Sequence, residues 1–90
     1  PQFASFDTAF HATNLPAATT YALPRALREA GLRRYGFHGI SYASLVERLD
    51  PLPPRLLALH LGNGASLCAI RDGRSVATSM GYSPLDGLVM

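Results

Sequence analysis

The chain has 90 residues, of which 48% are hydrophobic and 16% are charged, and its formal net charge is +2. This balance is typical of a globular segment and argues against a disordered chain. Ninety residues form at most one small domain with a modest core. No run of eighteen apolar residues predicts a membrane span, and no basic stretch followed by an apolar one predicts a secretory signal. Because the first residue is Pro1 rather than Met, we expect an internal piece of a longer protein.

The basic residues are all arginine and are scattered along the chain. Arg33 and Arg34 beside Tyr35 and Phe37 come nearest to the basic and aromatic surface of a nucleic-acid-binding domain. A solvated helix end is the simpler interpretation, so we expect no nucleic-acid partner. Cys68 is the single cysteine, which excludes an internal disulfide and a cysteine-based metal set and favours the reducing cytoplasm.

The first half of the chain predicts one strand and one helix. Residues 2–6 are predicted to form a short strand that leads into Asp7. Residues 19–30 are predicted to form a helix, because apolar side chains recur there at i, i+4 and i+7. Pro24 fits only in a first turn, so the helix can instead begin there. Gly31 is the expected stop.

The second half predicts a helix and then a meander of strands. Residues 41–49 are predicted to form a helix capped by Ser41, which a proline-rich loop ends. Apolar runs then predict strands over residues 56–61, 65–71 and 75–79. Asp72-Gly73 between the last two strands is a strong signal for a tight hairpin turn.

The sequence His-Leu-Gly-Asn-Gly-Ala-Ser at residues 60–66 joins two of these strands. Glycines such as Gly62 and Gly64 let a backbone approach a ligand closely and direct N–H groups at phosphate oxygens. An ordinary hairpin turn explains the tripeptide centred on Asn63 at least as well. A P-loop is excluded, because no Gly-Lys-Ser/Thr sequence and no helix follow.

Two further residues are candidates for chemistry. His38 precedes a predicted helix, where an imidazole N–H can donate to an anion near the helix N-terminus. Asp7 follows a predicted strand, and α/β enzymes often place reactive carboxylates at strand ends. Each also has a structural interpretation, His38 as a capping or core-edge residue and Asp7 as a turn or N-cap residue.

The remaining site types have little support in the sequence. His11, His38 and His60 together with Asp7 offer suitable metal-binding atoms, but no pair has the spacing of a known ligand motif. No serine lies in a G-x-S-x-G turn, so nucleophilic catalysis is not indicated. We therefore assign no metal ligand.

Four segments taken together resemble the acetate kinases of the acetokinase family. They are Phe-Asp-Thr-Ala-Phe-His at residues 6–11, Arg-Arg-Tyr-Gly-Phe-His-Gly at 33–39, His-Leu-Gly-Asn-Gly-Ala-Ser at 60–66 and Thr-Ser-Met-Gly-Tyr-Ser-Pro-Leu-Asp-Gly-Leu at 78–88. Each alone is weakly or moderately specific, but four in the family's order are highly specific. The resemblance covers nearly the whole chain.

The resemblance implies an α/β fold, the ribonuclease-H-like duplicated lobes shared by acetate and sugar kinases, actin and heat-shock ATPases. Only a partial lobe would be present, from the end of the first lobe to the start of the second. It also implies that Asp7 is an active-site aspartate and that His38 stabilises the transition state. The nucleotide-binding stretch that it implies is His60, Leu61, Gly62, Asn63 and Gly64.

The implied reaction is the reversible, direct transfer of a phosphoryl group between ATP and acetate, giving ADP and acetyl phosphate. The implied cofactors are ATP and Mg²⁺, with the metal ligands outside this chain. Because acetate, with a pKa of about 4.3 like that of Glu, is already ionised at neutral pH, we expect Asp7 to orient a Mg²⁺-bound water or the metal rather than to remove a proton. A cytoplasmic homodimer without nucleic-acid or membrane partners is implied for the complete protein, and no activity is expected of these 90 residues alone.

Departures from the family pattern leave alternatives open. The family usually has Gly-Thr-Ser-His where this chain has Gly39-Ile40-Ser41-Tyr42. These departures leave open a propionate or butyrate kinase of the same family. A non-catalytic ATP-binding or structural module is the alternative from another class.

Overall fold

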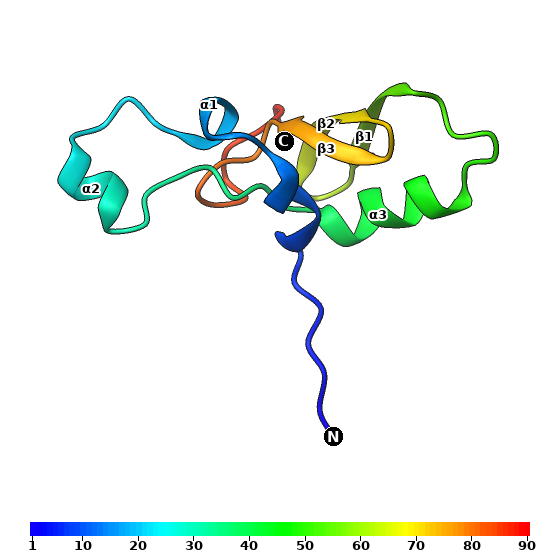
Figure 1. Cartoon of the computed structure of the whole chain (residues 1–90), viewed down its shortest axis with the longest axis horizontal. Coiled ribbons are helices and arrows are strands. Elements are labelled where there is room, and N and C mark those ends of the chain that lie inside the picture. Colours follow the sequence, from blue (N-terminus) through cyan, green and yellow to red (C-terminus); the bar gives the residue numbers. More distant parts are fainter.

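The computed structural model describes all 90 residues, Pro1–Met90. Three strands form one sheet, with helices before it in the chain and irregular segments at both ends (Figure 1). The elements in order are a 3-10 helix η1 (Ala9–Thr13), α1 (Pro16–Thr19), α2 (Arg25–Glu29), α3 (Gly39–Arg48), β1 (Arg55–Leu61), β2 (Ala65–Arg71) and β3 (Arg74–Thr78).

The sheet is an antiparallel meander in the order β1-β2-β3. β1 pairs with β2 around residues 62–64, so that His60 lies opposite Ser66. Asp72 and Gly73 join β2 to β3 with φ angles of 49° and 80°. Two successive positive φ angles are what a type I′ turn requires. Both predicted hairpins are therefore confirmed, and β3 begins one residue earlier than expected.

One face of the sheet, which we call the closed face, packs against α3 and η1. The buried apolar cluster on this face consists of Tyr42, Ala58, Cys68 and Ile70. A bulge between β2 and β3 shifts the register at Ala69/Ile70. Such a shift changes which side chains point inward, and both Ser75 and Thr78 are buried. The closed face therefore holds polar side chains as well as apolar ones.

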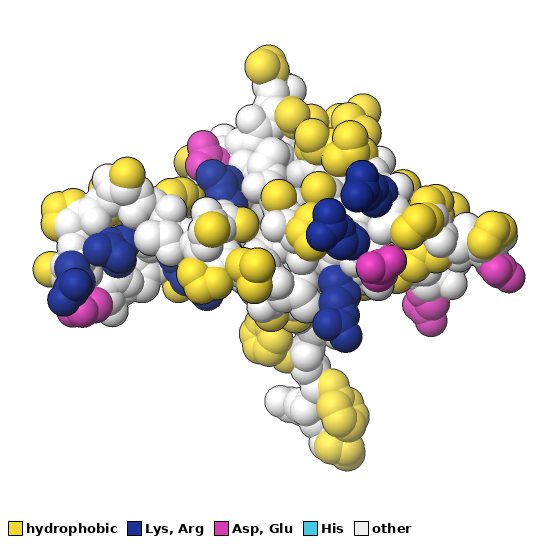
Figure 2. All heavy atoms as spheres, turned by 45° about the horizontal axis from the view of Figure 1, so that its top comes forward, with side chains coloured by type: hydrophobic (Ala, Val, Ile, Leu, Met, Phe, Trp, Pro, Cys, Tyr) yellow, Lys and Arg dark blue, Asp and Glu magenta, His cyan; other side chains and the backbone are white.

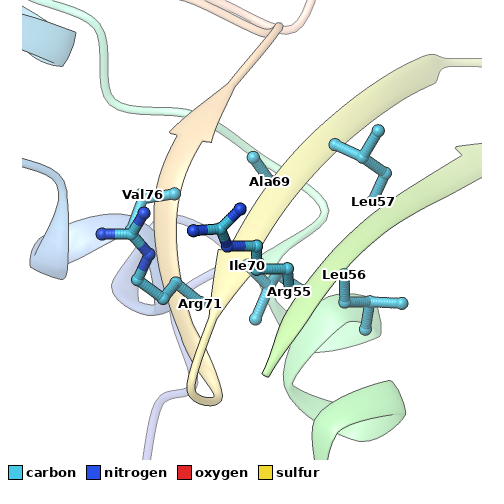
Figure 3. Close-up of a pocket in the computed structure, with 7 residues that line it drawn as sticks. All are labelled: Arg55, Leu56, Leu57, Ala69, Ile70, Arg71 and Val76. Carbon is cyan, nitrogen blue, oxygen red and sulfur yellow. The ribbon is translucent and has the colours of Figure 1, made fainter. Parts of the chain in front are cut away.

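The other face, the open face, has no covering element. Strand residues alternate between faces, and Leu57, Leu59, Leu61 and Val76 are all exposed. The largest hollow of the molecule lies at one end of this face. It lies beside Arg55, the first residue of β1, and Arg71, the last residue of β2 (Figure 3). Figure 2 shows apolar side chains over much of the surface and no histidine on the side in view.

Two predictions for the first half are wrong. Residues 2–6 form no strand, because no other strand lies beside them to complete a hydrogen-bonded ladder, and Phe3 is 93% exposed. The segment projects from the body of the molecule (Figure 1). The helix predicted over residues 19–30 is confined to α2, with Pro24 as its N-cap. Pro24 lacks the N–H that a helix interior needs, and the helix begins at Arg25, one residue after the alternative start.

The helix predicted over residues 41–49 exists as α3 but begins two residues earlier. His38, not Ser41, is its N-cap residue, and the His38 side chain makes no capping hydrogen bond to the helix. Gly31 does end α2 as expected, with φ 101°. None of the helices is long and apolar enough to cross a membrane.

Candidate functional site

The segment before α3 brings Asp7 and His38 together although they are 31 residues apart in the chain. The backbone N–H of His38 donates to Asp7 Oδ2 at 2.7 Å, and that of Ile40 donates to Asp7 Oδ1 at 3.3 Å. The N–H of Gly39 donates to the backbone carbonyl of Asp7 at 2.9 Å. These three donors are the unpaired N–H groups of a helix N-terminus. Asp7 therefore caps α3 from a distant part of the sequence, and its negative charge suits that end of the helix dipole.

His38 has a left-handed backbone, with φ 58° and ψ 21°. A non-glycine residue in this region carries a conformational cost of order 1–3 kcal/mol. The bonds from the Asp7 carboxylate to the amides of His38 and Ile40 hold it there. A side chain on Gly39 would collide with the backbone carbonyl of Asp7, so this close approach requires glycine. The imidazole of His38 lies against the sheet, beside His60 of β1 and Ser66 of β2.

The imidazoles of His38 and His60 stack, with ring centroids 3.9 Å apart and an interplanar angle of 28°. Nδ1 of His38 lies 2.8 Å from Ser66 Oγ, and Nδ1 of His60 lies 2.9 Å from Ser41 Oγ. Burial lowers the pKa of His38, the nearby His60 lowers it further, and the charge of Asp7 partly offsets both. His38 is therefore neutral at neutral pH, with one ring N–H to donate.

The glycine turn at residues 62–64 lies beside the His38 ring. A Cβ atom at Gly64 would be 3.3 Å from His38 Nε2 and 3.4 Å from its Cε1. Neither glycine of the turn has a positive φ, so Gly64 is needed for close approach rather than for its backbone angle. The N–H of Gly62 donates to Gly64 O at 3.0 Å and closes the turn. Asn63 is exposed at its tip.

The predicted site residues thus fall into two groups. Asp7, His38, His60 and Gly64 converge on one region at the N-terminus of α3. Gly62 and Asn63 follow at the exposed turn, while the side chain of Leu61 points to the open face and is 70% exposed. Only the backbone of Leu61 can serve this region.

His11 lies in a separate buried cluster, where it packs against Ser75 and Phe37. Its Nδ1 is 2.8 Å from Ser75 Oγ, and its Nε2 is 2.9 Å from the carbonyl oxygen of Phe37. Burial lowers its pKa, and the Phe37 carbonyl partly offsets this. By holding Phe37, His11 supports the residue just before His38.

The sequence interpretation missed Ser66 and Tyr42 as site residues. Ser66 Oγ contacts both His38 Nδ1 and the hydroxyl of Tyr42. Two signals could have found them. A hairpin centred on Asn63 places residue 66 opposite residue 60, and residues 38 and 42 have the i, i+4 spacing of one helix face.

The arrangement provides donors for an anion on an open surface. None of the three hollows of the molecule is lined by Asp7, His38, His60 or Gly64. No group of three His, Cys, Asp or Glu side chains is close enough together to hold a metal ion. Each carboxylate oxygen of Asp7 already accepts a backbone N–H. The residues present therefore suit phosphate oxygens, but they do not form a Mg²⁺ site by themselves.

The chain is similar to known acetate and propionate kinases. The acetokinase family profile matches residues 1–90. The chain is 55% identical over 94 residues to the acetate kinase of Methylocella silvestris, covering 99% of this chain and 23% of that protein. It is also 55% identical over 96 residues to the propionate kinase of Yersinia enterocolitica, covering 99% of this chain and 24% of that protein.

Solved structures give the same result. The acetate kinase of Porphyromonas gingivalis matches 94% of this chain with a TM-score of 0.87 and 40% identity. A propionate kinase from Francisella tularensis matches 94% with a TM-score of 0.87 and 43% identity. In both cases the match covers 23% of the longer chain, so this chain spans about a quarter of the length of its relatives. The expected α/β fold is confirmed, and the chain belongs to the acetokinase family.

Proposed function

We propose that the complete protein carrying these residues is an ATP-dependent kinase of short-chain carboxylates, with acetate as its substrate. In the reaction an oxygen of acetate bonds to the γ-phosphorus of ATP while the bond from that phosphorus to the β,γ-bridging oxygen breaks. The products are acetyl phosphate and ADP, and the reverse reaction returns the phosphoryl group. The convergence of Asp7, His38, His60 and Gly64 is the observation that carries this proposal.

His38 is the proposed catalytic residue. Phosphoryl transfer depends on positioning and on neutralising charge at the equatorial oxygens, with little covalent chemistry for the protein. A neutral imidazole with one N–H beside an exposed glycine turn can donate to such an oxygen. His60 stacks on the same ring and lines the same place. Its position there helps to lower the pKa of His38 and so favours the neutral ring of that residue.

Asp7 is proposed to place His38, because its carboxylate binds the amides of His38 and Ile40. Each oxygen keeps a second lone pair, so the carboxylate can also face a water bound to Mg²⁺ whose other ligands lie elsewhere in the protein. ATP and Mg²⁺ are the proposed cofactors. When bound, the metal would neutralise phosphate charge.

The placement of the chain within the complete enzyme is also a proposal. Residues 1–90 would lie at the end of the first lobe and the start of the second, with the nucleotide in the cleft between the lobes. The open face of the sheet would pack against other parts of the protein, since it exposes Leu57, Leu59 and Val76. We propose that the 90 residues alone have no kinase activity, and that the complete enzyme is a cytoplasmic homodimer.

A propionate kinase is the second candidate, because propionate kinases are as similar to this chain as acetate kinases are. Acetate, propionate and butyrate should therefore be compared as substrates of the complete enzyme by acyl phosphate formation. A higher kcat/KM with acetate is expected. A higher value with propionate or butyrate would reassign the substrate and leave the reaction type intact.

The role of His38 is tested in the complete enzyme by His38→Ala. Loss of a donor to transition-state charge typically lowers kcat by about 10²–10³, so we expect a loss of this size with a small change in KM for acetate. Tyr35→Phe is a matched control, because it removes a hydroxyl bond to Gly31 O away from the stacked rings. An unchanged kcat in His38→Ala, or a change in KM alone, would refute the proposed role. No acyl phosphate formation by the unaltered complete protein would favour a non-catalytic module.

A further inference from the structure

A buried chain of hydrogen bonds leads from α3 through β2 to the imidazole of His38. The Tyr42 hydroxyl contacts Ser66 Oγ, and Ser66 Oγ lies 2.8 Å from His38 Nδ1. Tyr42 and Ser66 are both 0% exposed. The hydroxyl groups of Tyr42 and Ser66 must therefore find their hydrogen-bond partners within the protein rather than in bulk water.

The direction of the chain follows from counting donors and acceptors. Burial raises the pKa of Tyr42, so its hydroxyl keeps its proton at neutral pH. The His60 backbone also bonds this hydroxyl and lowers the pKa of Tyr42, as a donor does, so Ser66 Oγ is the acceptor within hydrogen-bonding distance. A buried hydroxyl proton without an acceptor costs about 1–3 kcal/mol. Tyr42 therefore donates to Ser66.

The remaining proton positions are then determined. Ser66 Oγ accepts the Tyr42 proton with one lone pair and has one proton of its own. Because this buried proton also needs an acceptor, Ser66 donates it to His38 Nδ1. A neutral imidazole that accepts at Nδ1 carries its proton on Nε2. Nε2 and its neighbour Cε1 are the ring atoms that face Gly64. The opposite direction, from His38 Nδ1–H to Ser66 to Tyr42, would leave the Tyr42 proton without an acceptor.

We propose that Tyr42 and Ser66 are positioning residues that hold His38 in the tautomer with its proton on Nε2, directed at the glycine turn where a phosphate oxygen would bind. The inference rests on the proposed function for its catalytic consequence. The tautomer itself does not depend on activity.

The catalytic consequence is tested by a double-mutant cycle in the complete enzyme. Tyr42→Phe keeps the ring and removes the donor, so we expect kcat to fall roughly 3- to 10-fold, the size of one neutral hydrogen bond, with KM for ATP and acetate nearly unchanged. Because Tyr42 acts through His38, adding Tyr42→Phe to His38→Ala should cause no further loss. Losses that multiply instead would overturn the proposal, since they would show an effect of Tyr42 that does not pass through His38.

Ser66→Ala provides a second variant. It removes the group that touches His38, so we expect a loss of kcat at least as large as that of Tyr42→Phe. It also leaves the buried Tyr42 hydroxyl without an acceptor, and a lower melting temperature should accompany the loss. Tyr35→Phe, the matched control, should leave kcat unchanged, because its hydroxyl bonds Gly31 O away from the stacked rings. Unchanged kcat in a folded Ser66→Ala variant would overturn the proposal.

The tautomer is tested directly by ¹⁵N NMR of the histidine rings in the complete enzyme near pH 8. We expect Nε2 of His38 to be protonated and Nδ1 to be an unprotonated acceptor, with a shift of the Nδ1 resonance in Tyr42→Phe and none in Tyr35→Phe. A protonated Nδ1 would overturn the proposal even if His38→Ala loses activity. Conversely, the expected tautomer together with full activity in His38→Ala would refute the catalytic role of His38. The hydrogen bonds from Tyr42 through Ser66 to His38 would still be supported.

Discussion

The two faces of the three-stranded sheet differ in what holds their side chains. On the closed face, Tyr42, Ser66 and Ser75 are fully buried and hydrogen-bonded to histidines or to one another. On the open face, leucine and valine side chains are exposed, with Leu57 and Val76 beside the hollow drawn in Figure 3. The same strands therefore position histidine side chains on one face and leave an uncovered apolar surface on the other. The difference indicates that the local site is organised by these 90 residues, whereas the stability of the sheet calls for more of the protein.

Matched truncations on the two faces should give the largest effect on stability. In the complete enzyme, Ile70→Ala on the closed face is expected to lower the free energy of unfolding by about 2–5 kcal/mol, because it leaves a cavity. Leu57→Ala should cost nearly as much if the open face is covered there, although Leu57 is 66% exposed in this chain. Chemical denaturation measures both values. A cost within about 0.5 kcal/mol for Leu57→Ala would show that the open face meets solvent in the complete enzyme.

Gly39→Ala should disrupt the packing of Asp7 against the N-terminus of α3. The added methyl group would collide with the Asp7 carbonyl, which is backbone and cannot rotate away. Overpacking of this kind costs about 1–3 kcal/mol, and displacement of Asp7 should also lower kcat. Thermal unfolding and activity of the complete enzyme measure the two effects. Ala43→Gly, on an exposed position of α3, is the control for helix propensity. A melting temperature for Gly39→Ala equal to that of the unaltered enzyme would contradict the close packing.

The buried His11 should make stability depend on pH. Burial lowers its folded pKa below the ordinary value of about 6.5, so the unfolded chain binds a proton first as the pH falls. Stability from this group is complete above the unfolded pKa and is lost as the pH falls through the folded pKa, with a slope of at most about 1.4 kcal/mol per pH unit. His11→Asn should reduce the slope below pH 6.5 in denaturation curves. An identical slope in this variant would assign the pH dependence to other groups.

The strained backbone of His38 should give the smallest effect. Glycine tolerates φ 58° better than alanine does, by about 1 kcal/mol. His38→Gly should therefore be more stable than His38→Ala, while both lack the imidazole and share the loss of kcat. Denaturation of the two variants under one condition gives the difference. Equal stability would mean that His38 leaves the left-handed conformation when its ring is removed.

The contacts also bear on how Asp7 acts. Asp7→Asn keeps one acceptor oxygen and loses the charge that favours the helix N-terminus. If Asp7 faces a Mg²⁺-bound water as well, this variant should need more Mg²⁺ for half-maximal activity. An unchanged Mg²⁺ requirement with lower stability would limit Asp7 to capping α3. An unchanged requirement with loss of one limb of the pH–rate profile would support acid–base catalysis instead.

The sequence predicted best where local chemistry decides the structure. The Asp72-Gly73 turn, the strands around it and the stop at Gly31 follow from backbone preferences that neighbours do not override. The strand predicted over residues 2–6 failed because a strand needs a partner, which a local pattern does not reveal. The helix predicted from residue 19 failed because Pro24 limits where a helix can begin.

The candidate site shows the same division. Its residues were found in sequence by resemblance, but their contacts depend on long-range packing. Asp7 caps a helix 31 residues away, and this contact leaves no trace in the local sequence. The link from Tyr42 to His38 through Ser66 combines a helix spacing with a hairpin register. Either pattern alone is common, and only their combination in the fold connects Tyr42 to His38.

The most direct test of the shared site is ¹⁵N NMR of the histidine rings during titration of the complete enzyme with a non-hydrolysable ATP analogue. The stacked rings of His38 and His60 should both shift, because they face the proposed phosphate position. His11, which is 1% exposed and bonded to Ser75 and Phe37, should not. A shift confined to His11, or no shift at any of the three rings at saturating nucleotide, would contradict a phosphate site at the N-terminus of α3.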